Sequence, residues 1–290
     1  MAKTPSPRAA LGAAAALALL APAILTAQDA ANKGLLGPWK ATAEVSYVVT
    51  SGNTSTSAFS LGTSFTRKWA NDSLLFKSYI LRSNATTTTR TARGTEIDFD
   101  IIENRVERLV AENYLLAGQY DRRVSKKLAA QAGMSWDRNR FAGVDDRVIL
   151  TMGFGYAWVE AKRTTIKTDA GLTYTWRQYV NQDTMSFGGL RFNLSAVQKV
   201  LDNSSLSTQF IFDENLKKMT DWRFDWTNSV TASISKSLAL KTSFRTIYTH
   251  LPALQGLPLF DLEGLPTGLT VFVPLKRLDT FLTTSIVINF

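Results

Sequence analysis

Apolar and polar side chains alternate one by one along most of the chain. The last ten residues read FLTTSIVINF and place Ile286, Ile288 and Phe290 two positions apart, with polar residues at 285 and 289. Successive side chains of an extended backbone point to opposite sides, so this spacing predicts a β-strand with one apolar face. A chain end frays unless it is held. We therefore expect the Phe290 face to meet an apolar neighbour.

The same alternation recurs in segments throughout the chain. In residues 148–158 the even positions hold Val, Leu, Met, Phe, Tyr and Trp, whereas positions 151, 153 and 155 hold Thr and Gly. The segments have about 10 to 14 residues, longer than the usual globular strand of about 5 to 6. Twelve strands are expected, with ten or fourteen as alternatives, at approximately residues 40–50, 57–69, 74–83, 109–122, 127–138, 146–159, 164–177, 188–200, 204–213, 222–235, 239–250 and 279–290.

The connections between these segments alternate in length. Short polar connections such as residues 70–73 and 160–163 follow every second segment, and several of the others are longer, notably residues 84–108 and 251–278. An even number of antiparallel strands with tight turns at one end and long loops at the other is typical of bacterial outer-membrane barrels. We therefore expect 84–108 and 251–278 to be cell-surface loops.

A soluble β-sandwich or a lipocalin-like barrel would also alternate. The tryptophans favour a membrane barrel, because all seven fall close to the end of an expected strand. A soluble core would bury them mid-strand, whereas a bilayer holds amphipathic rings at its two interfaces. With the N-terminus in the periplasm, the periplasmic set is Trp39, Trp69 and Trp158, and the outer set is Trp136, Trp176, Trp222 and Trp226. The expected fold class is all-β, an antiparallel up-and-down transmembrane β-barrel.

The N-terminus has the order of a secretory signal peptide. Lys3 and Arg8 precede an apolar run that ends near Leu25, and Ala27 is the last small residue before a polar stretch. A membrane anchor is the alternative, but the run is short, rich in Ala and broken by Pro22. The expected organisation is a signal peptide over 1–27, a short periplasmic segment over 28–38 and a barrel over 39–290 in the outer membrane of a Gram-negative envelope.

Composition and charge exclude several functions. The formal charge is +9. Removing the leader's two basic residues leaves 31 basic against 24 acidic residues, or +7, but these are scattered and form no nucleic-acid motif. There is no cysteine and a single histidine, His250, so we expect no metal site and no cofactor. A barrel lipid hydrolase would need His250 as its base, and it is the least favoured alternative to a barrel without enzymatic activity.

Three stretches resemble a known family. Trp39 opens a strand, SGNTSTSAF occupies 51–59 at the first hairpin, and LDTFLTTSIVINF occupies 278–290. Together they resemble the salt-induced outer-membrane proteins, long carried as a domain of unknown function, over about residues 38–290. The resemblance implies a barrel surrounded by outer-membrane lipid, and implies that Phe290 is an assembly signal read by the barrel-assembly machinery. It implies no substrate, catalytic residue or cofactor.

The alternation also places charged side chains on the inward face. Such charges are intolerable against lipid but acceptable in a wet or salt-bridged interior. One interpretation is a narrow passive pore for small polar or anionic solutes, since the eight basic residues exceed the four acidic ones. The other is a non-conducting structural or envelope-stress barrel, filled by paired charges, whose interior or loops bind a ligand. The expected inward charges are Glu44, Lys68, Lys77, Lys167, Asp169, Arg177, Arg191, Asp213, Arg223, Asp225, Lys241 and Arg245.

Overall fold

The protein folds into a closed barrel of twelve antiparallel strands, as the alternation predicts. The computed structural model describes residues 39–50, 54–94 and 99–290. The barrel order is β1-β14-β11-β10-β9-β8-β7-β6-β5-β4-β3-β2. Its strands are β1 (Trp39–Thr50), β2 (Thr54–Lys68), β3 (Asp72–Gly94), β4 (Phe99–Arg123), β5 (Leu128–Asn139), β6 (Val144–Glu160), β7 (Thr164–Tyr179), β8 (Thr184–Leu201), β9 (Ser204–Asn215), β10 (Trp222–Ser233), β11 (Leu238–Thr249) and β14 (Leu278–Asn289).

A separate hairpin of β12 (Leu254–Phe260) and β13 (Pro266–Pro274) projects from the barrel between β11 and β14. A single turn of 3-10 helix, η1 (Arg140–Ala142), joins β5 to β6. Within the described part of the chain, no helix is long and apolar enough to cross a membrane. The expected signal peptide (1–27) and periplasmic segment (28–38) lie outside the described residues.

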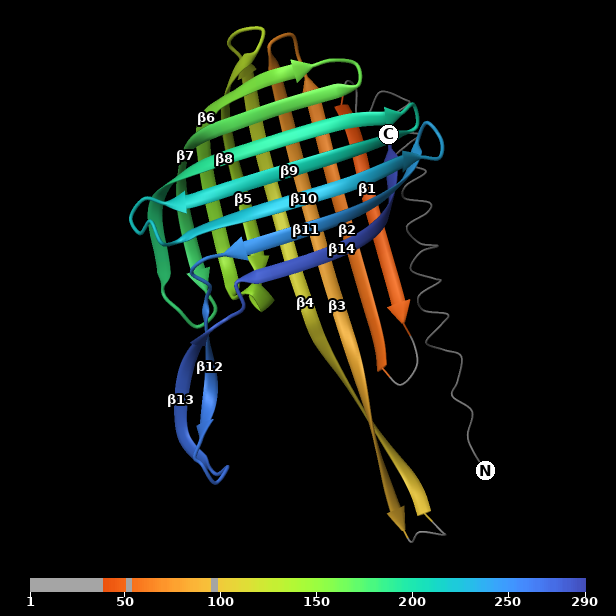
Figure 1. Ribbon diagram of the computed structural model, residues 1–290, viewed down its shortest axis with the longest axis vertical. Coiled ribbons are helices and arrows are strands. Elements are labelled where there is room, and N and C mark those ends of the chain that lie inside the picture. The colour runs from red at the N-terminus through yellow and green to blue at the C-terminus, as the bar shows by residue number, and fades with distance from the viewer. Residues whose placement is uncertain (1–38, 51–53, 95–98) are drawn as a thin grey trace.

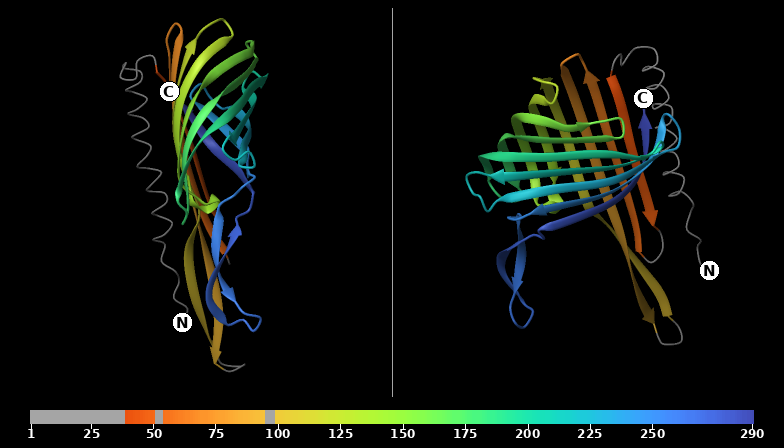
Figure 2. Two further views of the ribbon diagram at one scale, coloured as in Figure 1. Left: turned by 90° about the vertical axis from the view of Figure 1, so that its left-hand side faces the viewer. Right: turned by 45° about the horizontal axis from the view of Figure 1, so that its top comes forward.

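The two ends of the barrel differ. Strands of the front wall cross those of the back wall at a steep angle, as the tilted strands of a closed barrel do (Figure 1). Short turns and the C-terminus lie at one end, at the top of Figure 1. The β3–β4 and β12–β13 hairpins project from the opposite end (Figures 1 and 2). We call these the short-turn end and the hairpin end.

The two long connections are mostly paired strands, so the expected strand limits at 83 and 109 were wrong, whereas the expected cell-surface location stays a prediction. Residues 84–108 lie mostly in extensions of β3 and β4, which stay paired from Asn84 opposite Leu109 to Gly94 opposite Phe99. Residues 251–278 include the paired strands β12 and β13. The run of four threonines at 86–89 favours extended backbone. Outside a membrane a hairpin needs no apolar face, so the pairing continues where the apolar alternation stops.

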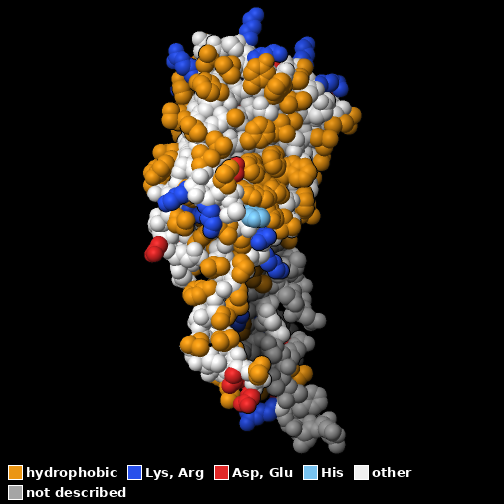
Figure 3. All heavy atoms as spheres, turned by 60° about the vertical axis from the view of Figure 1, so that its left-hand side comes forward, with side chains coloured by type: hydrophobic (Ala, Val, Ile, Leu, Met, Phe, Trp, Pro, Cys, Tyr) orange, Lys and Arg blue, Asp and Glu red, His pale blue; other side chains and the backbone are white. Residues whose placement is uncertain are grey.

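The outer surface of the barrel is apolar and the inner surface is mainly polar. On β7 the outward Leu172 is 63% exposed, whereas its inward neighbour Thr173 is 8% exposed. Orange side chains form a broad belt in Figure 3, with Lys and Arg side chains above and below it. In water such a surface would be far larger than the apolar patches of ordinary monomers. The barrel is therefore a transmembrane barrel, with its belt against lipid.

Two inward glycines let neighbouring strands approach closely. Gly153 of β6 lies opposite Gly171 of β7. A Cβ atom built on Gly153 would lie 2.2 Å from the carbonyl oxygen of Ala170, and one on Gly171 would lie 2.4 Å from that of Met152. A side chain at either position would push the strands apart, so glycine is needed for this close approach.

Candidate pore and its charged lining

The barrel encloses a cavity of about 540 Å³ to which all twelve barrel strands contribute side chains. Ten of the twelve charged residues expected to point inward line it, namely Lys77 and the following nine: Glu44, Asp169, Arg177, Arg191, Asp213, Arg223, Asp225, Lys241 and Arg245. Of the other two, Lys167 lies outside the lining and forms an ion pair with Glu160 (2.9 Å) near the short-turn end. Lys68 also lies outside it.

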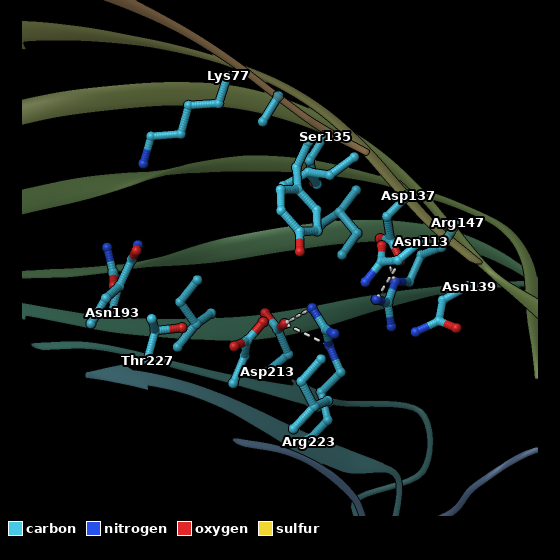
Figure 4. A pocket seen from close by; sticks show the side chains of 18 of the residues that line it. Lys77, Asn113, Ser135, Asp137, Asn139, Arg147, Asn193, Asp213, Arg223 and Thr227 are labelled. Carbon is cyan, nitrogen blue, oxygen red and sulfur yellow. Dashed lines mark hydrogen bonds and ion pairs between the residues drawn. The ribbon is translucent and has the colours of Figure 1, made fainter. Parts of the chain in front are cut away.

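Asp213 is the centre of the charged wall. Its carboxylate accepts two hydrogen bonds from Arg191, at 2.6 and 3.1 Å, and one from Arg223 at 3.0 Å. These residues come from the adjacent strands β8, β9 and β10, whose register places Asp213 opposite both arginines. Figure 4 shows Asp213 and Arg223 on the wall opposite Lys77. One carboxylate thus holds two guanidinium groups, and the cluster retains a positive charge.

Two further pairs lie on either side of this cluster. Arg147 of β6 donates two hydrogen bonds to Asp137 of β5, at 2.8 and 2.7 Å. Arg245 of β11 binds Asp225 of β10 in the same two-point manner. Two-point contacts of this kind fix the planar guanidinium group as well as neutralising it. They tie neighbouring strands together from inside the barrel.

The most buried pair lies near the hairpin end. Arg177 donates to both carboxylate oxygens of Asp221, at 3.2 and 2.8 Å, and the two side chains are only 7% and 4% exposed. Asn215 donates a further hydrogen bond to Asp221 at 2.9 Å. The guanidinium carbon of Arg177 also lies 4.4 Å from the ring centroid of Tyr179. A buried pair needs such extra contacts to offset the cost of removing both charges from water.

The complete lining does not carry the excess positive charge expected from the alternation. It contains seven basic and eight acidic residues. Arg147 adds one positive charge, but Asp137, Glu214, Asp221 and Asp279 add four negative ones, and Lys68 and Lys167 are absent from it. Asp137 and Arg147 were not among the expected inward charges, although the alternation along β5 and β6 could have placed them there. Asp221 lies in a turn just before β10, where the alternation of a strand does not predict which way a side chain points.

Lys77 and Asp169 are two of the charged cavity groups outside the arginine pairs, together with Glu214, Asp279 and the Glu44–Lys241 ion pair. Lys77 of β3 makes no hydrogen bond or ion pair with any residue that the structure describes, and it interacts electrostatically with Lys241 and Glu44. Asp169 accepts a hydrogen bond from the amide of Asn193 at 2.8 Å. These two groups are free to meet a solute, whereas the arginines are already bound.

The base of the β12–β13 hairpin covers part of the mouth at the hairpin end. Ala253 and Leu275 pack against Val144 and Tyr179 of the barrel. The backbone N–H of Leu275 donates to the carbonyl of Ala253 at 2.9 Å, and the Tyr179 hydroxyl donates to the carbonyl of Leu251 at 3.3 Å. The mouth is therefore narrowed by a packed apolar contact as well as by the buried ion pair behind it.

His250 has the surroundings of an interfacial aromatic residue. Its ring stacks on Trp222, with centroids 5.0 Å apart, and its Nδ1 atom lies 3.5 Å from the Tyr248 hydroxyl. Within the described part of the chain, no serine hydroxyl hydrogen-bonds to it, and no cluster of three His, Asp or Glu side chains suits a metal ion.

At the chain end, the N–H of Phe290 donates to the carbonyl of Ala41 at 3.0 Å.

The closed barrel, its apolar outer belt and its charged cavity place the protein in the class of porin-like transmembrane β-barrels. Within that class the chain belongs to the family described as protein of unknown function DUF481, whose model matches residues 43–263. No curated protein matches the chain in sequence.

Several solved outer-membrane channels are similar at low identity. A channel of Pseudomonas putida F1 is 9% identical over 87% of this chain and 95% of its own, with a TM-score of 0.43. The NanC porin is 8% identical over 86% and 97%, with a TM-score of 0.42. The KdgM porin is 6% identical over 86% and 99%, with a TM-score of 0.40.

Proposed function

We propose that the protein is a narrow passive pore for small polar solutes in the outer membrane of a Gram-negative cell, without enzymatic activity or a cofactor. The observation that supports this most directly is the cavity of about 540 Å³, large enough for many water molecules, inside a closed barrel with an apolar outer belt. A structural barrel of this size could fill its interior with packed apolar side chains. Here the interior instead holds ionised groups, which need water or partners.

The lining favours small solutes without a strong preference for either charge. Its basic and acidic residues nearly balance, and the arginines are held by two-point contacts that leave little freedom to bind a passing ion. Bound solutes would meet Lys77 and Asp169 on different walls. A pore must bind weakly enough for release, and single unpaired charges meet that requirement.

A second candidate is a non-conducting barrel whose interior or loops bind a ligand. The observation that favours it is the hairpin end, where the Arg177–Asp221 pair and the Ala253 contact narrow the mouth. If these contacts close the mouth completely, the cavity is a binding site with one entrance.

Conductance of the purified protein in planar bilayers distinguishes the two candidates. We expect discrete steps from the wild type, and larger steps after residues 254–274 are replaced by a short Gly-Ser linker that leaves Ala253 and Leu275 in place. If neither protein conducts while both are folded by heat-modifiable gel migration, the pore proposal fails and the binding barrel stands. If only the shortened protein conducts, the hairpin closes the native pore.

We also propose an orientation of the barrel in the membrane: the short-turn end faces the periplasm, because outer-membrane barrels have their short turns there. An epitope tag at Gly264, in the tip of the β12–β13 hairpin, should then be reached by antibody on intact cells. A tag in the short turn at Lys162 should be reached only after the outer membrane is opened. The opposite labelling pattern would show that the hairpin end faces the periplasm.

A further inference from the structure

The seam between β1 and β14 is much shorter than any other seam of the barrel. Its ladder pairs Thr42–Val45 with Ile286–Asn289, and the Phe290 N–H adds a bond to Ala41. Each other seam pairs at least ten residues of each strand. Beyond Val45 and Ile286, β1 pairs only with β2 and β14 only with β11 within the described residues. The seam is closed toward the short-turn end and unpaired toward the hairpin end.

Unpaired strand edges cannot face hydrocarbon alone. Each unsatisfied backbone N–H or C=O group costs several kcal/mol in lipid. Irregular backbone at membrane depth is tolerated where it lines a water-filled space. The edges of Ser46–Thr50 and Leu278–Ser285 therefore need water or a polar ligand, and they lie where the charged cavity meets the apolar belt.

An ion pair inside the barrel crosses the seam where the ladder ends. The Lys241 ammonium on β11 donates to both carboxylate oxygens of Glu44 on β1, at 2.8 and 3.0 Å, and so reaches across β14. Glu44 lies opposite Val287 and Lys241 opposite Ser285 in the ladders. Lys77 interacts electrostatically with both members of this pair and has no salt-bridge partner among the described residues. Two cations and one anion thus gather beside the open part of the seam.

The flanks of the open edge are apolar. Leu278, Leu282 and Ile286 on the outer face of β14 are all exposed, and Leu282 is 76% exposed. On the inner face Phe281 lines the cavity. Residues 275–277 join β14 to the β12–β13 hairpin, every residue of which is exposed although most of its large side chains are apolar. An alkyl chain leaving the cavity at this edge would therefore meet apolar side chains of β14.

We propose that the open half of the β1–β14 seam is a lateral binding site and passage for an anionic amphiphile. The head group binds the Lys77 ammonium beside the Glu44–Lys241 pair, and its oxygens accept hydrogen bonds from the unpaired N–H groups. The alkyl chain lies between β1 and β14 against Phe281 and Leu282, toward the lipid. The proposal depends on the barrel spanning a membrane but not on conduction along its axis.

A photoreactive dodecyl sulfonate with a diazirine in its chain tests the site on the full-length protein in liposomes. Labelled peptides are identified by mass spectrometry. We expect labelling concentrated in residues 46–49 and 278–285, and weaker labelling there by a probe with the same chain and a trimethylammonium head. Lys77→Gln should raise the half-saturating sulfonate concentration about tenfold, the effect of losing one charged hydrogen bond. Lys167→Gln, whose side chain lies outside the cavity, should leave it unchanged.

The proposal fails if both head groups label equally, if Lys77→Gln binds like the wild type, or if label spreads evenly over the apolar belt. It also fails if Tyr47→Cys, on the open edge, gives a disulfide-linked dimer in dilute liposomes without probe, because a second copy would then cover the edge. Conductance of the same preparations separates the two proposals. Selective labelling without conductance refutes the pore and supports the lateral site. Conductance without selective labelling refutes the lateral site and supports the pore.

Discussion

At the scale of single residues, neighbours along one strand face two different media. Phe192 of β8 lies on the apolar belt and is exposed, whereas Asn193 lies inside and donates to Asp169. An arginine at the middle of the lipid face costs roughly 2 to 4 kcal/mol. We expect Phe192→Arg to lower the free energy of unfolding in lipid by about that amount, and Asn193→Arg by much less, because its guanidinium can pair with Asp169. Urea titration in lipid vesicles measures both. Equal losses would mean that the two faces are assigned wrongly.

The buried Arg177–Asp221 pair gives a second prediction at this scale. Removing one partner of a buried pair strands the other charge and costs roughly 3 to 5 kcal/mol. Arg177→Gln should therefore destabilise the barrel by about that much, and the double variant Arg177→Gln, Asp221→Asn should recover part of the loss.

The exposed Arg163–Asp202 pair is the matched control, since its side chains are 61% and 96% exposed. Exposed pairs contribute about 0 to 1 kcal/mol, so Arg163→Gln should be nearly neutral. A loss for Arg177→Gln no larger than for Arg163→Gln would show that Arg177 stays hydrated in the folded barrel.

At the scale of strands, the open half of the β1–β14 seam can be tested without any ligand. The native chain has no cysteine, so every disulfide is an introduced one. Ala43 and Ile288 are paired across the seam. Tyr47 and Thr284 would be paired if the ladder continued. A disulfide needs Cα atoms about 4.4 to 6.8 Å apart. Mild oxidation should therefore link Ala43→Cys to Ile288→Cys within minutes and leave Tyr47→Cys, Thr284→Cys reduced, as read by thiol labelling. Equal rates would show that the seam closes fully.

The strands also show what the sequence could and could not predict. The twelve-strand closed barrel is confirmed, and strands such as β6 and β7 end within about two residues of their expected limits, because lipid on one side and water on the other enforce a period of two. The paired extensions of β3 and β4 were missed because that period ends where the strands leave the membrane. The short β1–β14 ladder could not be foreseen, since both strands alternate normally and only their spatial divergence limits the pairing.

At the scale of the whole molecule, the site differs from the expectation in its charge balance. The alternation predicted four of the five arginines of the lining and also Asp213 and Asp225, which bind three of them, but it did not predict four other acids of the lining. Asp221 reaches the cavity from a turn, and Asp279 enters at the start of β14. A lining of seven basic and eight acidic residues gives a different field from the excess of four positive charges that the alternation indicated.

That balance predicts the ion selectivity of the pore. With nearly equal fixed charges, the reversal potential in a potassium chloride gradient should lie close to zero for the wild type. Lys77→Glu changes the lining by two charges without breaking an ion pair, so it should make the pore cation-selective at 0.1 M salt. At 1 M the Debye length falls from about 10 Å to about 3 Å, and the selectivity should largely disappear. Lys167→Glu, at a side chain outside the cavity, should change the reversal potential far less. A clearly anion-selective wild type would show that the acidic residues of the lining are screened from the permeating ions, and that the arginines set the field of the pore despite their partners.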